Sequence, residues 1–143
     1  MKTLFTTLLF TLFLFTSEVA FSQKKKSNVP DTILKALEIK FPGVEVASWE
    51  HEGNFYEATF EINHHFFSAL FEGTGRLILI EEDIDPSNLP EVIKTYVLNN
   101  LKGKKVREAA KITDGSGRIS YSLGTSNHDY LFDSTGNLIR SHH

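Results

Sequence analysis

Two segments of the chain, about 60 residues apart, carry the same landmarks in the same order. Pro30 and Pro90 each open an amphipathic run, and Phe71 and Phe132 each precede a turn of similar sequence. The separation is 41 positions from Pro30 to Phe71 and 42 from Pro90 to Phe132. Two matched pairs of landmarks at nearly equal separation predict a duplicated unit, with one copy in residues 29–85 and the other in 86–143.

Each copy reads as one helix followed by strands. Pro at an early helical position loses no hydrogen bond, and apolar residues then recur at helical spacing. Short alternating segments separated by Gly- and Asn-containing turns follow in both copies. We therefore expect an α+β fold, a tandem repeat of a helix plus a four-stranded antiparallel meander, with both helices on one face of a curved sheet. The acidic segment 81–87 is expected to join the two units.

The first 22 residues have the features of a signal peptide. One Lys precedes an apolar core of about 12 residues, which is too short to cross a bilayer as a helix. Ala20 and Ser22 occupy the positions that a signal peptidase reads, so cleavage near Ser22 is expected, followed by a disordered leader over 23–28. The chain has no Cys for lipid attachment. A periplasmic or secreted protein, not inserted in the membrane after cleavage, is the prediction.

Composition and motifs argue against several classes of function. A net charge of −3 gives no electrostatic basis for nucleic-acid binding. Thiol catalysis and thiolate metal sites are excluded by the absence of Cys, and no phosphate-binding loop or nucleophile elbow occurs. The adjacent pair His64–His65 would point to opposite faces of a strand and is a poor chelator. We predict a protein that is not an enzyme, with no cofactor, no metal site and no catalytic residues.

The first unit has more apolar residues than a sheet covered on one side needs. Strict alternation places Tyr56, Ala58 and Phe60 toward the helices, and it leaves a second apolar set on the face away from them. The predicted partner-binding residues are Trp49, Phe55, Glu57, Phe66, Leu70, Ile78 and Ile80. Glu57 and Glu61 would form the rim of this patch. An exposed apolar patch of this kind marks a partner-binding surface, unless the second unit or a loop folds over it.

The sequence resembles the PepSY-like family of β-lactamase-inhibitor-like proteins. The resemblance rests on Val29–Gly43, on the strand at Trp49–Glu50, on Phe55–Phe60 and on Ala69–Glu72. It implies a β-lactamase-inhibitor-protein-like fold, in which the inhibitor that names the fold binds a protein through its sheet. The family provides no catalytic residues to carry over.

Two functions follow from these observations. The first is an exported, non-enzymatic binding module, inhibitory or regulatory toward an unknown periplasmic or secreted protein or peptide, which acts through the face away from the helices. The alternative is a carrier of a small molecule or peptide, with the curved sheet as its cleft. A closed apolar pocket would favour the carrier, and an open apolar surface would favour the binding module.

Overall fold

The computed structural model describes residues 29–142. The predicted signal peptide (1–22) and leader (23–28) therefore lie outside the described residues. The described elements, in chain order, are α1 (Asp31–Lys40), β1 (Val46–Glu52), β2 (Phe55–Ile62), β3 (His65–Glu72), β4 (Leu77–Ile84), the 3-10 turn η2 (Pro86–Asn88), α2 (Glu91–Asn100), β5 (Glu108–Asp114), β6 (Ile119–Gly124), β7 (Asp129–Asp133) and β8 (Leu138–His142).

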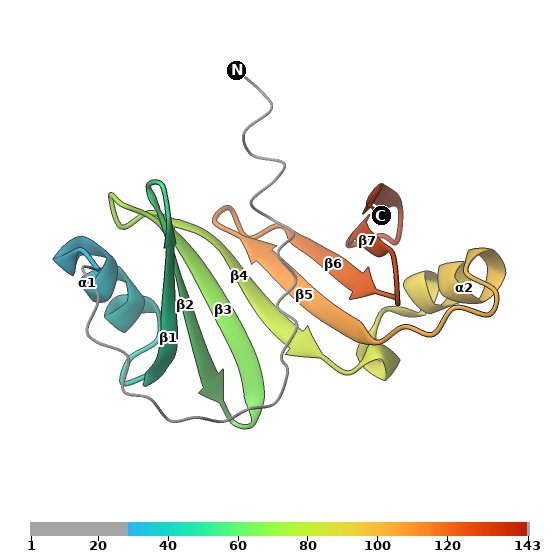
Figure 1. Cartoon of the computed structure of the whole chain (residues 1–143), viewed down its shortest axis with the longest axis horizontal. Helices are drawn as coiled ribbons and strands as arrows, with labels where there is room; N and C mark the ends of the chain where they lie inside the picture. Colours follow the sequence, from blue (N-terminus) through green and yellow to red (C-terminus); the bar gives the residue numbers. More distant parts are fainter. Residues whose placement is uncertain (1–28, 143) are drawn as a thin grey trace, which may run out of the picture.

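The strands form one continuous sheet. All eight are antiparallel to their neighbours, in the order β1 to β8 of the chain (Figure 1). The predicted tandem repeat of a helix plus a four-stranded meander is wrong as a description of this fold, because β4 and β5 pair over six successive positions, from Leu79–Asp114 to Ile84–Ala109. Residues 81–84, expected to begin a linker, instead complete β4. The backbone groups of this acidic segment thus gain partners in the sheet.

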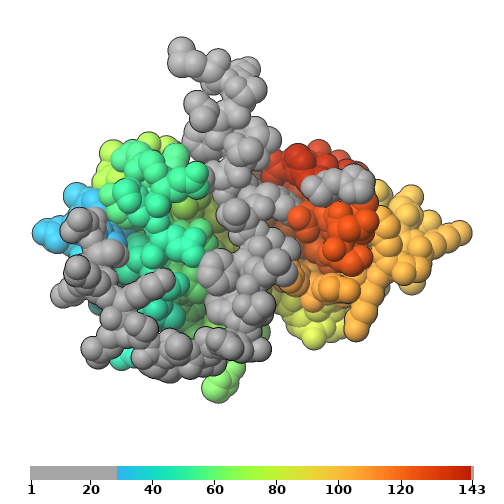
Figure 2. Space-filling view, in the orientation of Figure 1, coloured from blue at the N-terminus to red at the C-terminus, as the bar shows by residue number. Residues whose placement is uncertain are grey.

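Both helices pack on the same face of the sheet. Ile33 and Leu37 of α1 join a core with Ala58, Phe60, Ala69 and Phe71, all of which are buried. Ile93 of α2 joins a second core with Leu89, Leu101, Ala109, Leu123, Tyr130 and Phe132. The two helices stand at opposite ends of the molecule, with the strands between them (Figures 1 and 2).

Aspartate side chains stabilise two of the tight turns. Asp133 accepts hydrogen bonds from the backbone N–H groups of Thr135 and Asn137, both at 2.9 Å. Asp114 accepts from the backbone N–H groups of Ser116 and Arg118 at 2.8 and 3.0 Å. A carboxylate that accepts several N–H bonds fixes the turn backbone and is favoured in its ionised form. These turns set the registers of β5 with β6 and of β7 with β8.

Candidate functional site

The strand registers define the sheet face that turns away from the helices, which we call the open face. Residues directly opposite each other on paired strands share a face. Glu57 lies opposite Leu70, and Leu70 lies opposite Leu79. Neighbouring positions on the same strands, Ala58 and Ala69, belong to the core beneath α1. Glu57, Leu70 and Leu79 therefore lie on the open face.

A compact apolar group occupies the middle of this face. We call it the central cluster, and its buried members are Leu70, Leu79, Ile112 and Leu131, which are 9%, 8%, 6% and 8% exposed. Phe55 and Ile78 pack against it. The cluster draws on β2, β3, β4, β5 and β7 and, among the described residues, includes none from a helix. The second half of the chain thus contributes Ile112 and Leu131 to a surface that the sequence assigned to the first half.

A β-bulge in β4 corrects the predicted position of Ile80. Leu70 pairs with Leu79, but the next residue, Phe71, pairs with Leu77, so that Ile78 is the extra residue on β4. Strict alternation from Leu77 would place Ile78 and Ile80 together on the open face. The bulge moves Leu79 to the open face instead, and Ile80 pairs with Ala69 on the helix-covered face.

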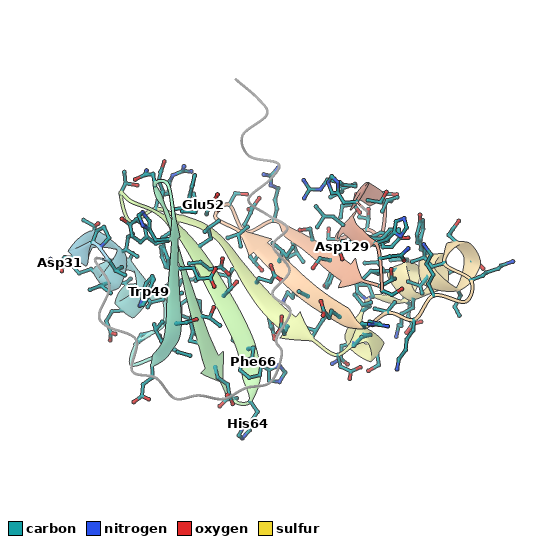
Figure 3. All side chains as sticks on the ribbon, viewed as in Figure 1. Asp31, Trp49, Glu52, His64, Phe66 and Asp129 are labelled. Atoms are coloured by element: carbon teal, nitrogen blue, oxygen red, sulfur yellow. The ribbon has the colours of Figure 1, made fainter. Side chains whose placement is uncertain are left out.

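Trp49 also lies on the helix-covered face. It pairs with Ala58 and packs against the core beneath α1. Figure 3 shows its side chain between β1 and α1. Trp49 and Ile80 therefore leave the predicted set. Phe55, Glu57, Phe66, Leu70 and Ile78 remain at the open face, and their role in binding a partner stays a prediction.

Phe66 is the most accessible apolar side chain of the predicted set. It lies on β3 opposite Glu61 and is 48% exposed. Figure 3 shows it toward one end of β3, close to the turn that carries His64. Large aromatic side chains are frequent anchors for a protein partner.

Carboxylates form the second component of the open face. The strand positions of β1–β7 on this face carry acidic side chains and no Lys, Arg or His, as the registers show. We call Glu57, Glu81, Asp83 and Glu108 the acidic stripe; they cross the face from β2 through β4 to β5. Of these four residues, only Glu57 was predicted on this face; Glu81 and Asp83 were expected in a linker, and Glu108 was not among the predicted residues. In an extended segment Ile80 and Ile84 fall on one face and Glu81 and Asp83 on the other. This pattern was the signal that could have extended the predicted strand to residue 84.

The environment of the stripe favours the protonated acids. Burial raises the pKa of Glu81 to about 7, and repulsion from Asp83 and Glu57 adds to the rise. Burial also raises the pKa of Glu57; a hydrogen bond with Ser68 opposes this rise, and repulsion from Glu50 adds to it. Burial is the main cause of the raised pKa of Glu108; repulsion from Asp129 and Asp83 adds to the rise, and the positive charge of Arg107 opposes it. The stripe therefore carries carboxyl groups whose charges are incompletely compensated within the fold.

One carboxyl oxygen of the stripe is buried without a hydrogen-bond partner among the described residues. This atom is Oε2 of Glu108. Glu81 likewise forms no hydrogen bond or ion pair with a described residue. A buried carboxylate oxygen is normally paired, so Oε2 of Glu108 indicates a place where an external donor can be accommodated.

The described residues contain neither a metal-binding cluster nor a membrane-spanning helix. No three His, Asp or Glu side chains between residues 29 and 142 are arranged to hold a metal ion. Both described helices have 10 residues, and neither has the length and apolar character needed to cross a membrane.

Comparison with solved structures relates this architecture to proteins of Bacteroides. A protein from Bacteroides eggerthii that is described as periplasmic superposes with a TM-score of 0.73 at 15% identity, covering 80% of this chain and 88% of the other. A DUF2874 family protein from Bacteroides uniformis gives 0.69 at 20% identity, covering 79% and 88%. A BLIP-like protein from Bacteroides fragilis gives 0.67 at 16% identity, covering 79% and 84%. No family model and no curated protein matches the sequence.

These likenesses define the fold. The chain has the architecture of the BLIP-like and DUF2874 proteins over about four-fifths of its length. The predicted β-lactamase-inhibitor-protein-like shape is thus supported, whereas the PepSY-like family name is not confirmed. At identities of 20% or less the likenesses do not carry over a function.

Proposed function

We propose that this chain is an exported, non-enzymatic module that binds another protein through the open face. The observation that carries the proposal is the half-exposed ring of Phe66 on the same face as the central cluster, whose own members are at most 9% exposed. Leu70, Leu79, Ile112 and Leu131 form an apolar group on a sheet face that neither described helix covers. Apolar side chains surrounded by polar groups form the usual arrangement of a protein–protein interface.

The surroundings of the cluster fit an interface. Phe66 supplies an accessible aromatic ring, and Phe55 packs against the cluster from the edge of β2. The acidic stripe provides the polar surroundings. An apolar centre supplies binding energy as water is excluded, and charged groups around it set orientation and partner choice.

The N-terminal sequence, which lies outside the described residues, supports export. The apolar segment after Lys2 and the small residues Ala20 and Ser22 support cleavage near Ser22 and residence in the periplasm or outside the cell. Mass spectrometry of the protein recovered from the producing cells should give a chain beginning at Gln23. Recovery of the chain from the cytoplasm with Met1 retained would contradict export.

The binding proposal is tested with one substitution on the open face and one matched control. Phe66→Ser removes an aromatic ring that is 48% exposed, and Leu98→Ser removes an apolar side chain on α2 that is 74% exposed. Immobilised wild-type protein and Leu98→Ser should retain the same partner from an envelope extract, and Phe66→Ser should lose it. Hydrogen exchange with the purified partner should then slow in β3 and β4.

Two results would contradict the proposal. One is equal recovery of the partner by Phe66→Ser and the wild type. The other is a tightly bound small molecule that native mass spectrometry detects on the open face, which would favour the carrier.

A further inference from the structure

The charges of this chain are distributed unevenly between its two faces. The whole sequence has 15 Lys and Arg against 18 Asp and Glu, which is nearly balanced. On the strands of the open face, however, basic groups occur only on β8 among the described residues, as Arg140 opposite Leu131 and His142 opposite Asp129. The total charge is therefore nearly balanced, although the open face is strongly acidic over β1–β7.

Some acidic groups at the margins of this surface are neutralised from within. Arg76 pairs with Glu72 at 3.0 Å, and Arg118 pairs with Asp114 at 2.8 Å. Nδ1 of His64 also lies within hydrogen-bonding distance of Oε1 of Glu61, at 3.2 Å. No such ion pair reaches Glu57, Glu81, Asp83 or Glu108 within the described residues. The uncompensated charge is therefore concentrated in the acidic stripe.

The stripe also lies directly against apolar surface. Glu81 has Ser68 of β3 on one side and Ile112 of β5 on the other. Leu79 precedes it by two residues on the same face, and Ile112 and Leu79 both belong to the central cluster. A ligand that reaches Glu81 therefore lies next to Leu79 and Ile112 of the central cluster.

The spacing of the stripe excludes one compact cation as its natural ligand. Neighbouring strands lie about 4.8 Å apart, so the distance from β2 to β5 is on the order of 14 Å. These carboxylates do not converge on one point, in agreement with the lack of a metal-binding cluster among residues 29–142. Several separate cations on one extended ligand match this geometry.

We propose that the acidic stripe binds a protein segment rich in Arg and Lys, whose cations pair with Glu57, Glu81, Asp83 and Glu108 while its apolar side chains or stems cover the central cluster. The inference rests on the proposed function and specifies the chemistry of its partner. Guanidinium groups suit this surface, because they donate several hydrogen bonds to carboxylates and lie flat on apolar surface. The free Glu108 Oε2 is one acceptor that such a donor would satisfy.

The affinity for such a segment should depend on pH. The groups facing Glu81 are Glu57 from β2, Asp83 from its own strand, Ser68 from β3 and Ile112 from β5, with Asp114 farther along β5 already paired with Arg118. None of them is cationic. A cationic ligand favours the ionised acid, so binding should displace a proton from Glu81 and become tighter as the pH rises from 5.5 to 8.

The test uses two labelled peptides and two matched double variants of the full-length mature protein. One peptide alternates six Arg with Gly, and its counterpart has Glu in place of Arg. Glu81→Gln/Glu108→Gln removes two charges from the stripe, and Glu38→Gln/Glu91→Gln removes two from the helices. Circular dichroism confirms that each variant is folded, and fluorescence anisotropy measures binding at low salt.

The expected result is specific binding of the Arg peptide at pH 8. The stripe variant should bind at least tenfold more weakly than the wild type, and the helix variant should stay within twofold. Affinity of the wild type should rise severalfold between pH 5.5 and 8, and Glu81→Gln should lose most of that rise. Amide resonances of β2, β4 and β5 should shift when the peptide binds.

Equal weakening in both double variants would overturn the inference, because it would show attraction by net charge alone. Shifts confined to other strands or to the helices would also overturn it. A native partner that requires Phe66 but is insensitive to Glu81→Gln/Glu108→Gln would overturn the inference while leaving the proposed function intact. Binding of the Arg peptide at the stripe, with no native partner dependent on Phe66, would support the ligand chemistry and contradict the proposed function.

Discussion

Gly115 donates its backbone N–H to the carbonyl oxygen of Ile78 at 2.8 Å, which joins the turn after β5 to the bulge in β4. The bulge places Leu79 in the central cluster and Ile80 on the other face. The contact also leaves no space for a side chain, since a Cβ at position 115 would lie 2.5 Å from the carbonyl oxygen of Leu77. A turn in the second half of the chain thus holds the geometry of the open face in the first half.

Gly115→Ala should therefore destabilise the fold and disturb the bulge. The new methyl group meets backbone, which moves at greater cost than a side chain, and we expect a loss of about 1–3 kcal/mol. Gly73→Ala is the matched control, because its new Cβ meets the side chain of Asn54, which can rotate away. Urea unfolding measures both. A smaller loss for Gly115→Ala than for Gly73→Ala would show that the contact between turn and bulge is not constraining.

Glu81→Gln should stabilise the protein above neutral pH. In the folded state the pKa of Glu81 is about 7, against 4.5 for the model carboxyl. Between these values the folded chain holds a proton that the unfolded chain has released, so this group favours folding most at low pH and loses that contribution as the pH rises through 7. The amide carries no charge and avoids the loss.

The measurement is urea unfolding of the wild type and Glu81→Gln at pH 5 and pH 8. We expect a gain of about 1–3 kcal/mol for the variant at pH 8 and a much smaller difference at pH 5. Glu91→Gln, at a side chain that is 85% exposed, should differ little from the wild type at either pH. A gain for Glu81→Gln that is the same at both pH values would point to packing and not to the charge.

Asp133→Asn should lower the stability of the fold at neutral pH and make that stability less dependent on pH between 5 and 2. Hydrogen bonds from Thr135 and Asn137 hold the pKa of Asp133 at about 2, below its ordinary value of 3.8. Its contribution to stability is complete above pH 3.8 and disappears as the pH falls through 2. Thermal unfolding between pH 5 and 2 should show a steeper decline for the wild type than for the variant. Ser134→Ala, in the same turn, should follow the wild type; parallel curves for all three proteins would contradict the assignment.

Local patterning predicted the faces of β2 and β3 but not that of β4. Alternation of side chains was enough to place Phe55, Glu57, Phe66 and Leu70, because those strands pair without interruption. Alternation placed Ile80 on the wrong face, because the bulge at Ile78 depends on a turn that lies far away in the sequence. A bulge stabilised by such a distant contact leaves no local sign in an apolar segment.

The pairing of β4 with β5, which joins the two halves of the chain, could not be predicted from the sequence either. Residues 81–84 are acidic and precede Pro86, which favours a linker when they are considered alone. Their partners in β5 begin only after α2, and strand pairing over such a separation is a tertiary property. The acidic stripe was not predicted for the same reason, since only that pairing places Glu108 on the same face as Glu81 and Asp83.

Phe60→Ala should destabilise the fold much more than Phe66→Ala, because Phe60 lies on the helix-covered face and Phe66 on the open face. Phe60 is 0% exposed, and its ring centroid lies 4.8 Å from that of Phe41 and 5.9 Å from that of Phe67. Its loss leaves a cavity beneath α1 and should cost about 3–5 kcal/mol. Phe66 is half exposed on the open face, so its truncation should cost less than about 1 kcal/mol. Urea unfolding of both variants at pH 7 measures the difference. Comparable losses would mean that the Phe66 ring supports the fold, and its substitution would then no longer be a clean test of partner binding.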